Sequence, residues 1–119
     1  MDCIDLEQKL ALFDDPWSPR IVAEANGQHL KLVKLEGPYV WHAHAEAEEV
    51  FLVLAGAFTM ECRCRAVALG PGQMIVVPRG VEHRPVAQGP CSVLLFEPAG
   101  LLSTGDGPST EQTTAGSWL

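Results

Sequence analysis

The chain has 119 residues, 47% of them hydrophobic, which suits one globular domain with one core. Fifteen acidic residues against eight basic residues give a net charge of -7, which disfavours binding to nucleic acid or to an anionic membrane. The longest apolar run, 50–55, is too short to span a bilayer, and the first residues lack the pattern of a signal peptide. We therefore expect a cytoplasmic protein without nucleic-acid or membrane partners.

The chain begins with an arm, residues 1–19, whose apolar positions predict a short helix or an irregular segment ending before Pro16. Asn26-Gly27 is the strongest two-residue hairpin signal and predicts antiparallel strands over 21–24 and 29–35. Further strands are expected at 39–44, 49–55, 58–65, 73–77 and 91–97, with Gly- and Pro-rich turns between them, including one at 88–90. This spacing predicts an all-β sandwich or barrel over 20–100.

Two stretches, 50–54 and 74–77, are apolar at consecutive positions, so both faces of these strands must be covered. One face would line the barrel, and the other would lie against a second sheet or a second subunit. The tail, 101–119, is rich in Ser, Thr and Gly and is expected to be loop or extended arm, with a frayed end favoured over docking of Trp118 and Leu119.

The four cysteines form no Cys-x-x-Cys pair, and we expect them to be reduced. Cys62 and Cys64 are two residues apart, so on a strand they would share one face. That placement suits either small core residues or a soft-metal or redox site, and the core interpretation is favoured.

Three of the four histidines have spacings that suit a buried metal ion. His42 and His44 are two residues apart, so on a strand both imidazoles project from one face. A carboxylate and a third imidazole from other strands would complete a nitrogen and oxygen shell that suits Fe, Mn, Ni, Cu or Zn, with positions open for substrate. We predict one divalent metal ion bound by four residues: His42, His44, Glu49 and His83.

Either Glu48 or Glu49 could supply the carboxylate. The alternation over 49–55 directs Glu49 inward and favours it, which leaves Glu48 as a solvated charge or as an acceptor for a ligand histidine. His29 directly follows the Asn-Gly turn and is expected to be exposed. The alternative, in which each histidine is only a polar residue at a strand end, is weakened because the candidate ligands occur together.

These residues resemble the two motifs of the cupins, small β-barrels of the jelly-roll kind. The first motif, Gly-x(5)-His-x-His-x(3–4)-Glu-x(6)-Gly, is matched by Gly37, His42, His44, Glu49 and Gly56, with only four residues after Gly37. The second motif, Gly-x(5)-Pro-x-Gly-x(2)-His-x(3)-Asn, is matched by Gly72, Pro78, Gly80 and His83, with Ala87 in place of Asn.

The resemblance covers roughly 31–98 and implies a double-stranded β-helix, or jelly-roll barrel, with metal ligation through Glu49 and with homodimers. The Asn replaced by Ala87 is not a metal ligand in the motif, so only local turn geometry is affected. The segment 94–106 is similar to small bacterial cupins described as mannose-6-phosphate isomerase-like, although the sequence contains no evident phosphate-binding loop.

Two functional hypotheses follow. The first, which we favour, is a metal-dependent isomerase- or dioxygenase-class enzyme acting on a small polar substrate inside the barrel. Phe58 and Met60 could line its pocket, and Arg79 or Arg84 could lie at the rim, although core and solvated roles are the ordinary alternatives. The second is a non-catalytic module that binds or senses a small ligand, which the lack of a long lid loop favours.

Overall fold

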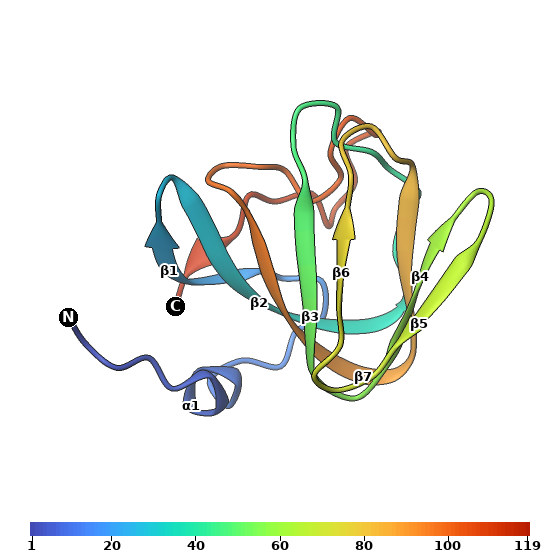
Figure 1. Ribbon diagram of the computed structural model, residues 1–119. Coiled ribbons are helices and arrows are strands. Elements are labelled where there is room, and N and C mark those ends of the chain that lie inside the picture. Colours follow the sequence, from blue (N-terminus) through green and yellow to red (C-terminus); the bar gives the residue numbers. More distant parts are fainter.

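The computed structural model describes residues 1–119 and is almost entirely β-structure (Figure 1). The elements in chain order are α1 (Leu6–Leu10), β1 (Arg20–Ala25), β2 (Gln28–Pro38), β3 (Glu49–Ala55), β4 (Phe58–Cys62), β5 (Ala66–Leu69), β6 (Met74–Val77), β7 (His83–Pro98) and β8 (Ser117–Trp118). The all-β prediction is confirmed. No helix here has the length and apolar character needed to span a membrane.

The strands form one strongly curved sheet in the order β5-β4-β7-β2-β1-β8, with β3 paired to β7 and to β6. Figure 1 shows the long strands β2 and β7 curving around the interior, with the β4–β5 hairpin on one side and the β1–β2 hairpin on the other. This is the predicted jelly-roll arrangement, except that hydrogen bonding does not close the sheet into a complete ring.

The β1–β2 hairpin forms where the Asn-Gly dipeptide predicts it. Asn26 and Gly27 both have positive φ, 53° and 74°, and these two left-handed positions allow a tight turn whose twist matches that of the flanking strands. The prediction of a turn at 88–90 is wrong, because β7 continues through these residues. There β2 has a register shift between Leu35 and Gly37, so the paired strands bend together around the core.

Two other strand predictions differ from the structure. Residues 39–44 form no regular strand, and only His42 makes an isolated bridge, to His83. The predicted strand 58–65 ends at Cys62, where a tight turn begins, and the chain returns as β5, which the sequence analysis missed. Cys62 is half-buried and Cys64 is exposed, so neither is a core residue, and all four cysteines are free.

The N-terminal arm contributes more than its one helix. Asp5 caps α1 by accepting a hydrogen bond from the Gln8 backbone, yet α1 buries no side chain. Beyond it, Phe13 and Trp17 are buried. Trp17 has a positive φ of 56°, and two hydrogen bonds to β2 hold it there. Its backbone N–H donates to the Lys34 carbonyl, and its indole N–H donates to the Glu36 carbonyl. Trp17 is therefore anchored to β2 and is part of the core.

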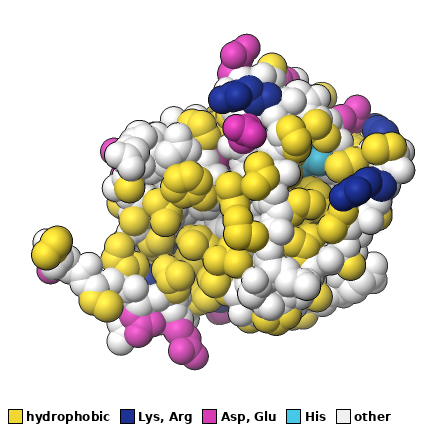
Figure 2. Space-filling model, in the orientation of Figure 1, with side chains coloured by type: hydrophobic (Ala, Val, Ile, Leu, Met, Phe, Trp, Pro, Cys, Tyr) yellow, Lys and Arg dark blue, Asp and Glu magenta, His cyan; other side chains and the backbone are white.

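The core lies inside the curved sheet and consists of 14 buried apolar residues, among them Phe51, Phe58, Met60, Val93 and Leu95. The opposite side of β3, β6 and β7 is also apolar but is not covered by this chain. We call it the outer apolar face, and cross-strand pairing places together its six side chains: Val50, Leu52, Met74, Val76, Leu94 and Phe96. Figure 2 shows apolar side chains gathered over this part of the surface.

Candidate metal centre

Pairing between the two histidine motifs builds the site. The backbone N–H of His42 donates to the His83 carbonyl at 3.0 Å, and that of His83 donates to the His42 carbonyl at 2.8 Å. The N–H of Gly80 donates to the His44 carbonyl at 2.9 Å, which joins the motifs again one step along the chain. Glu49 begins β3 beside them and pairs with Val77 of β6. Three segments, residues 42–44 and the first residues of β3 and β7, therefore meet at one place in the barrel.

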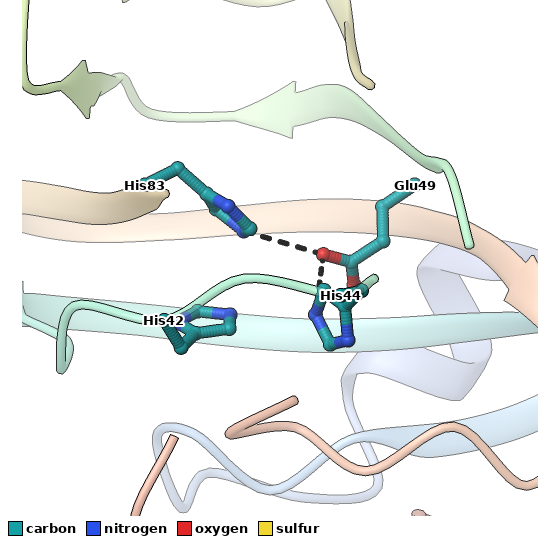
Figure 3. A group of neighbouring side chains, drawn as sticks. All are labelled: His42, His44, Glu49 and His83. Carbon is teal, nitrogen blue, oxygen red and sulfur yellow. Dashed lines mark ion pairs between the residues drawn. The ribbon is translucent and has the colours of Figure 1, made fainter. Parts of the chain in front are cut away.

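The structure brings all four predicted ligands together, and all four are buried (Figure 3). One ligand atom from each residue lies within 4.8 Å of every other. Glu49 Oε1 is 2.9 Å from His44 Nε2 and 3.3 Å from His83 Nε2. Two ligands at right angles on one ion, with bonds of about 2.1 Å, lie about 3 Å apart, so these separations suit a shared ion.

Hydrogen bonds set the imidazoles for metal binding. His42 Nδ1 lies 2.9 Å from the Val40 carbonyl, and His83 Nδ1 lies 2.8 Å from the Val81 carbonyl. A carbonyl only accepts, so each Nδ1 carries the proton and each Nε2 keeps a free lone pair. The buried His44 Nε2, His83 Nε2 and Glu49 Oε1 contact one another but make no hydrogen bond of good geometry. Orphaned buried ligand atoms are unusual, and one cation among them would satisfy all three.

The ionisation states also suit a cation. Burial, reinforced by the nearby His83 and His44 and opposed by the Val40 carbonyl, lowers the pKa of His42 to about 4. Burial alone would raise the pKa of Glu49, but contacts with Glu97, His44 and His83 outweigh it and hold that pKa well below its usual value. At neutral pH His42 is thus neutral and Glu49 is a carboxylate, the forms in which both bind metal.

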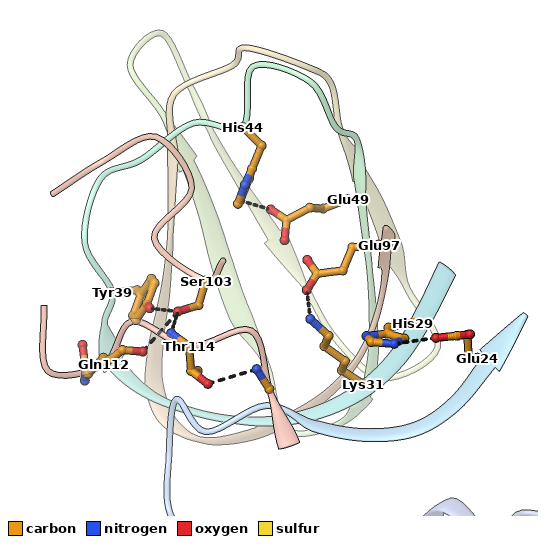
Figure 4. A network of polar contacts seen from close by, with 11 residues as sticks. Glu24, His29, Lys31, Tyr39, His44, Glu49, Glu97, Ser103, Gln112 and Thr114 are labelled. Atoms are coloured by element: carbon orange, nitrogen blue, oxygen red, sulfur yellow. Dashed lines mark hydrogen bonds and ion pairs between the residues drawn. The ribbon is translucent and has the colours of Figure 1, made fainter. Parts of the chain in front are cut away.

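A second buried carboxyl group, Glu97 of β7, adjoins the site. It contacts the carboxyl group of Glu49, and its Oε1 lies 2.7 Å from the Nζ of Lys31 on β2 (Figure 4). Burial and then the neighbouring Glu49 raise the pKa of Glu97 to about 9. The sequence analysis missed both Lys31 and Glu97, because neither belongs to the histidine motifs.

A small cavity of about 40 Å³ is lined by one candidate ligand, His42, and by Trp17. Its polar atoms come from Tyr39, His42, Glu97 and Ser103, and its apolar lining includes Trp17 and Phe51. The volume suffices for only a few water molecules. Phe58 and Met60, proposed as pocket lining from the sequence, do not line this cavity and belong to the core.

The tail covers the open end of the barrel, through a segment that we call the strap, residues 101–107. The Asp106 N–H donates to the Ala43 carbonyl, and the Asp106 side chain accepts from the Ala45 N–H, both at 2.8 Å. Gly105 is so close to the first motif that an added Cβ would lie 2.2 Å from the Ala43 oxygen. The tail then continues to β8, which pairs with β1, and is not frayed.

Other predicted site residues lie outside the centre. Glu48 is exposed and pairs with Arg79 at 3.8 Å, so Glu49 and not Glu48 faces the histidines. Arg84 pairs with Glu61 at 2.7 Å, and neither it nor Arg79 lines the cavity. The prediction that His29 is exposed is wrong, since it is buried with its Nε2 2.8 Å from Glu24.

Comparison with known proteins identifies the relatives of the chain. The sequence profile of the family described as Cupin domain matches residues 32–97. The uncharacterized protein YdbB of Bacillus subtilis (strain 168) is 30% identical over 64 residues, which are 53% of this chain and 57% of YdbB. This chain therefore spans little more than half the length of that curated relative.

Two solved structures are more similar over a larger part of the chain. A cupin-2 domain containing protein from Shewanella frigidimarina NCIMB 400 has 44% identity and a TM-score of 0.79, covering 80% of this chain and 93% of its own. Protein NMB1881 from Neisseria meningitidis has 34% identity and a TM-score of 0.75, covering 82% and 99%. Both likenesses include most of the barrel.

Proposed function

The chain belongs to the cupin domain family, and from this premise we propose that it binds one divalent transition metal ion and acts on a small molecule inside the barrel. The proposed ligands are His42, His44, Glu49 and His83. The observation that carries the proposal is the set of buried ligand atoms that face one another without hydrogen-bond partners. Because Nδ1 of His83 carries the proton, its Nε2 and Glu49 Oε1 face each other as two acceptors without a metal ion, at a cost in free energy that a bound cation would remove.

Bound there, a divalent metal ion would supply a Lewis acid or a site for oxygen chemistry, depending on the metal. The residues of the chain would do the rest. The Val40 and Val81 carbonyls orient two of the imidazoles, and the strap packs against the first histidine motif through Asp106 and Gly105. The mixed shell of imidazole and carboxylate ligands accepts Fe, Mn, Ni, Zn or Cu.

The alternative is a module that binds or senses a small ligand without turnover. The small cavity beside His42 favours it, because about 40 Å³ holds only a few water-sized groups. The sequence analysis supported this alternative by the lack of a long lid loop. That support is withdrawn, because the strap packs over the first histidine motif. Turnover of sugars, sugar phosphates, phenols and keto acids by the metal-loaded protein would distinguish an enzyme from a binding module.

The likeness to mannose-6-phosphate isomerase-like cupins is a narrower proposal. It requires a place for a phosphate group, and the two arginines nearest the histidine motifs, Arg79 and Arg84, already have carboxylate partners. Sugar phosphates therefore belong in the substrate panel, and activity on them alone would support this subtype.

Exchange of Glu49 for glutamine tests the metal proposal most directly. Glu49→Gln keeps the size of the side chain but removes its charge, and we expect the dissociation constant for Zn²⁺ or Co²⁺ to rise by more than about 100-fold, since loss of outer-shell partners alone costs 10- to 100-fold. Glu48→Gln is the matched control and should bind like the wild type, because Glu48 is exposed. Metal analysis of the untagged protein would identify the native ion, and equal binding by both variants would contradict the proposal.

We also propose that the protein is a cytoplasmic homodimer with neither nucleic-acid nor membrane partners. Four free cysteines suit a reducing compartment, and the net charge of -7 disfavours anionic partners. The outer apolar face supports a dimer, because an exposed apolar surface of this kind often marks an interface. We retain the division into an arm (1–19), a barrel (20–100) and a tail (101–119) as a proposal.

A further inference from the structure

A buried lysine–glutamate pair lies directly behind the candidate metal centre. The side chains of Lys31 and Glu97 are only 1% and 5% exposed, and Lys31 Nζ lies 2.7 Å from Glu97 Oε1. In every other pair between a lysine or arginine and a carboxylate, both side chains are at least 23% exposed. This pair therefore differs in kind from the surface ion pairs of the protein.

Stability does not explain the pair. Two ionisable groups lose their hydration when they are buried, and apolar side chains of similar size often stabilise a core equally well or better. Lys31 shares its face of β2 with the core residues Val33 and Leu35, and Glu97 shares its face of β7 with Leu95. An all-apolar layer would fit this position, so the two polar side chains call for another role.

The pair is connected to the centre through one contact. Figure 4 shows His44, Glu49, Glu97 and Lys31 in a row, with one oxygen of Glu49 directed at His44 and its carboxyl group also facing Glu97. Glu49 Oε1 is the oxygen shared by His44 and His83, so contact with Glu97 restricts the rotation of the Glu49 carboxyl group. Lys31 in turn holds Glu97 in place.

We propose that Lys31 and Glu97 are positioning residues of the metal centre, which hold Glu49 with Oε1 directed at His44 and His83. This inference rests on the proposed metal function. Neither residue would contact the ion. Their removal should change the affinity for the ion and its ligand field while leaving the barrel folded.

The test compares metal binding with stability in one double variant. Lys31→Met/Glu97→Leu replaces the pair with apolar side chains of similar size, and we expect a folded protein at least as stable as the wild type. We expect its dissociation constant for Co²⁺ to rise about 10- to 100-fold, the usual effect of losing a group that orients a ligand. The visible absorption spectrum of bound Co²⁺ should also change, which a merely structural role would not cause.

Two further variants keep the test decisive. Lys34→Met is the matched control, because Lys34 lies on the same strand but contacts the arm at Phe13, and it should bind Co²⁺ like the wild type. If the double variant does not fold, Lys31→Met, which removes only the group that holds Glu97, should still bind Co²⁺ about 10-fold more weakly. A folded double variant, or Lys31→Met, with wild-type affinity and spectrum would overturn the inference. Failure of the wild type to bind any metal would instead refute the proposed function.

Discussion

The imidazole of His42 is kept neutral by its surroundings. The folded chain lowers the pKa of His42 from 6.5 to about 4, chiefly by burial, so the ring does not need to lose a proton before it binds metal near neutral pH. The unfolded chain takes up that proton near pH 6.5, whereas the folded chain takes it up only near pH 4. Acid within this window therefore favours unfolding.

The difference between the pKa of His42 in the folded and unfolded chains predicts a loss of unfolding free energy in acid that a variant without His42 does not show. Between pH 6.5 and 4, the metal-free wild type should lose up to about 3 kcal/mol more unfolding free energy than His42→Gln, because the variant has no such proton to bind. Urea unfolding of both proteins in the presence of a chelator, at several pH values, measures it. Parallel losses in the two proteins would contradict the low pKa.

The residue scale also shows what sequence patterns could and could not find. Three histidines and Glu49 stand out because their spacing is unusual, and the structure places them together. Lys31 and Glu97 were missed although a signal existed, since each alternates in step with buried apolar neighbours on its strand. Charged residues are usually taken to face solvent, and only the contact between two strands far apart in sequence reveals that these two face inward.

Outside the ligand-bearing segments, the strap packs directly against the candidate metal centre. Ser103 accepts a hydrogen bond from the Tyr39 hydroxyl on the cavity wall, and Thr104 is almost completely buried. Gly105 has a positive φ of 52°, and an added Cβ there would lie 2.8 Å from His44 Nδ1. Only glycine therefore fits against the first histidine motif.

Gly105→Ala should displace the strap. We expect a loss of about 1–3 kcal/mol in unfolding free energy from the strained backbone and the clash, together with faster release of metal to a chelator. Gly89→Ala is the matched control, because a Cβ at Gly89 meets no atom within 4 Å. Urea unfolding and the rate of chelator-driven metal loss measure the two effects. The same values in both variants would show that the strap does not protect the centre.

Element boundaries were predicted where local chemistry determines them. The Asn26-Gly27 hairpin follows from two residues that tolerate positive φ, whereas the start of α1 at its capping residue Asp5 was not predicted. The region 39–44 alternates like a strand, yet only His42 finds a bridge partner, so its conformation depends on distant pairing. The continuation of β7 through 88–90 likewise depends on β2 bending alongside it, which no local pattern of Gly and Pro can show.

At the scale of the whole molecule, the barrel has two apolar surfaces and one chain covers only the inner one. On the outer apolar face, Met74, Val76 and Phe96 are 60%, 47% and 39% exposed. The sequence analysis expected this second face to meet another sheet or another subunit, and no other sheet of this chain lies on it. A second copy of the chain is the covering that we propose.

A charge placed on this face should separate the proposed dimer. Val76→Glu should raise the dimer dissociation constant by at least about 100-fold, because burying an unpaired carboxylate costs several kcal/mol. Leu12→Glu is the control, since Leu12 is equally apolar and exposed but lies in the arm. Sedimentation velocity over a range of protein concentrations measures both. A monomeric wild type, or a dimer unaffected by Val76→Glu, would contradict the proposed interface.

The aromatic rings between the two ends of the barrel form a short row. Trp17 stacks on Tyr39 with ring centroids 4.6 Å apart, and Tyr39 meets His42 edge-on at 5.6 Å. The one indole that is deeply enclosed thus lies a single ring away from a candidate ligand, whereas Trp118 is exposed to solvent. The protein therefore carries an intrinsic fluorophore beside the candidate metal centre, so binding of Cu²⁺ or Co²⁺ there should quench tryptophan fluorescence without any added dye.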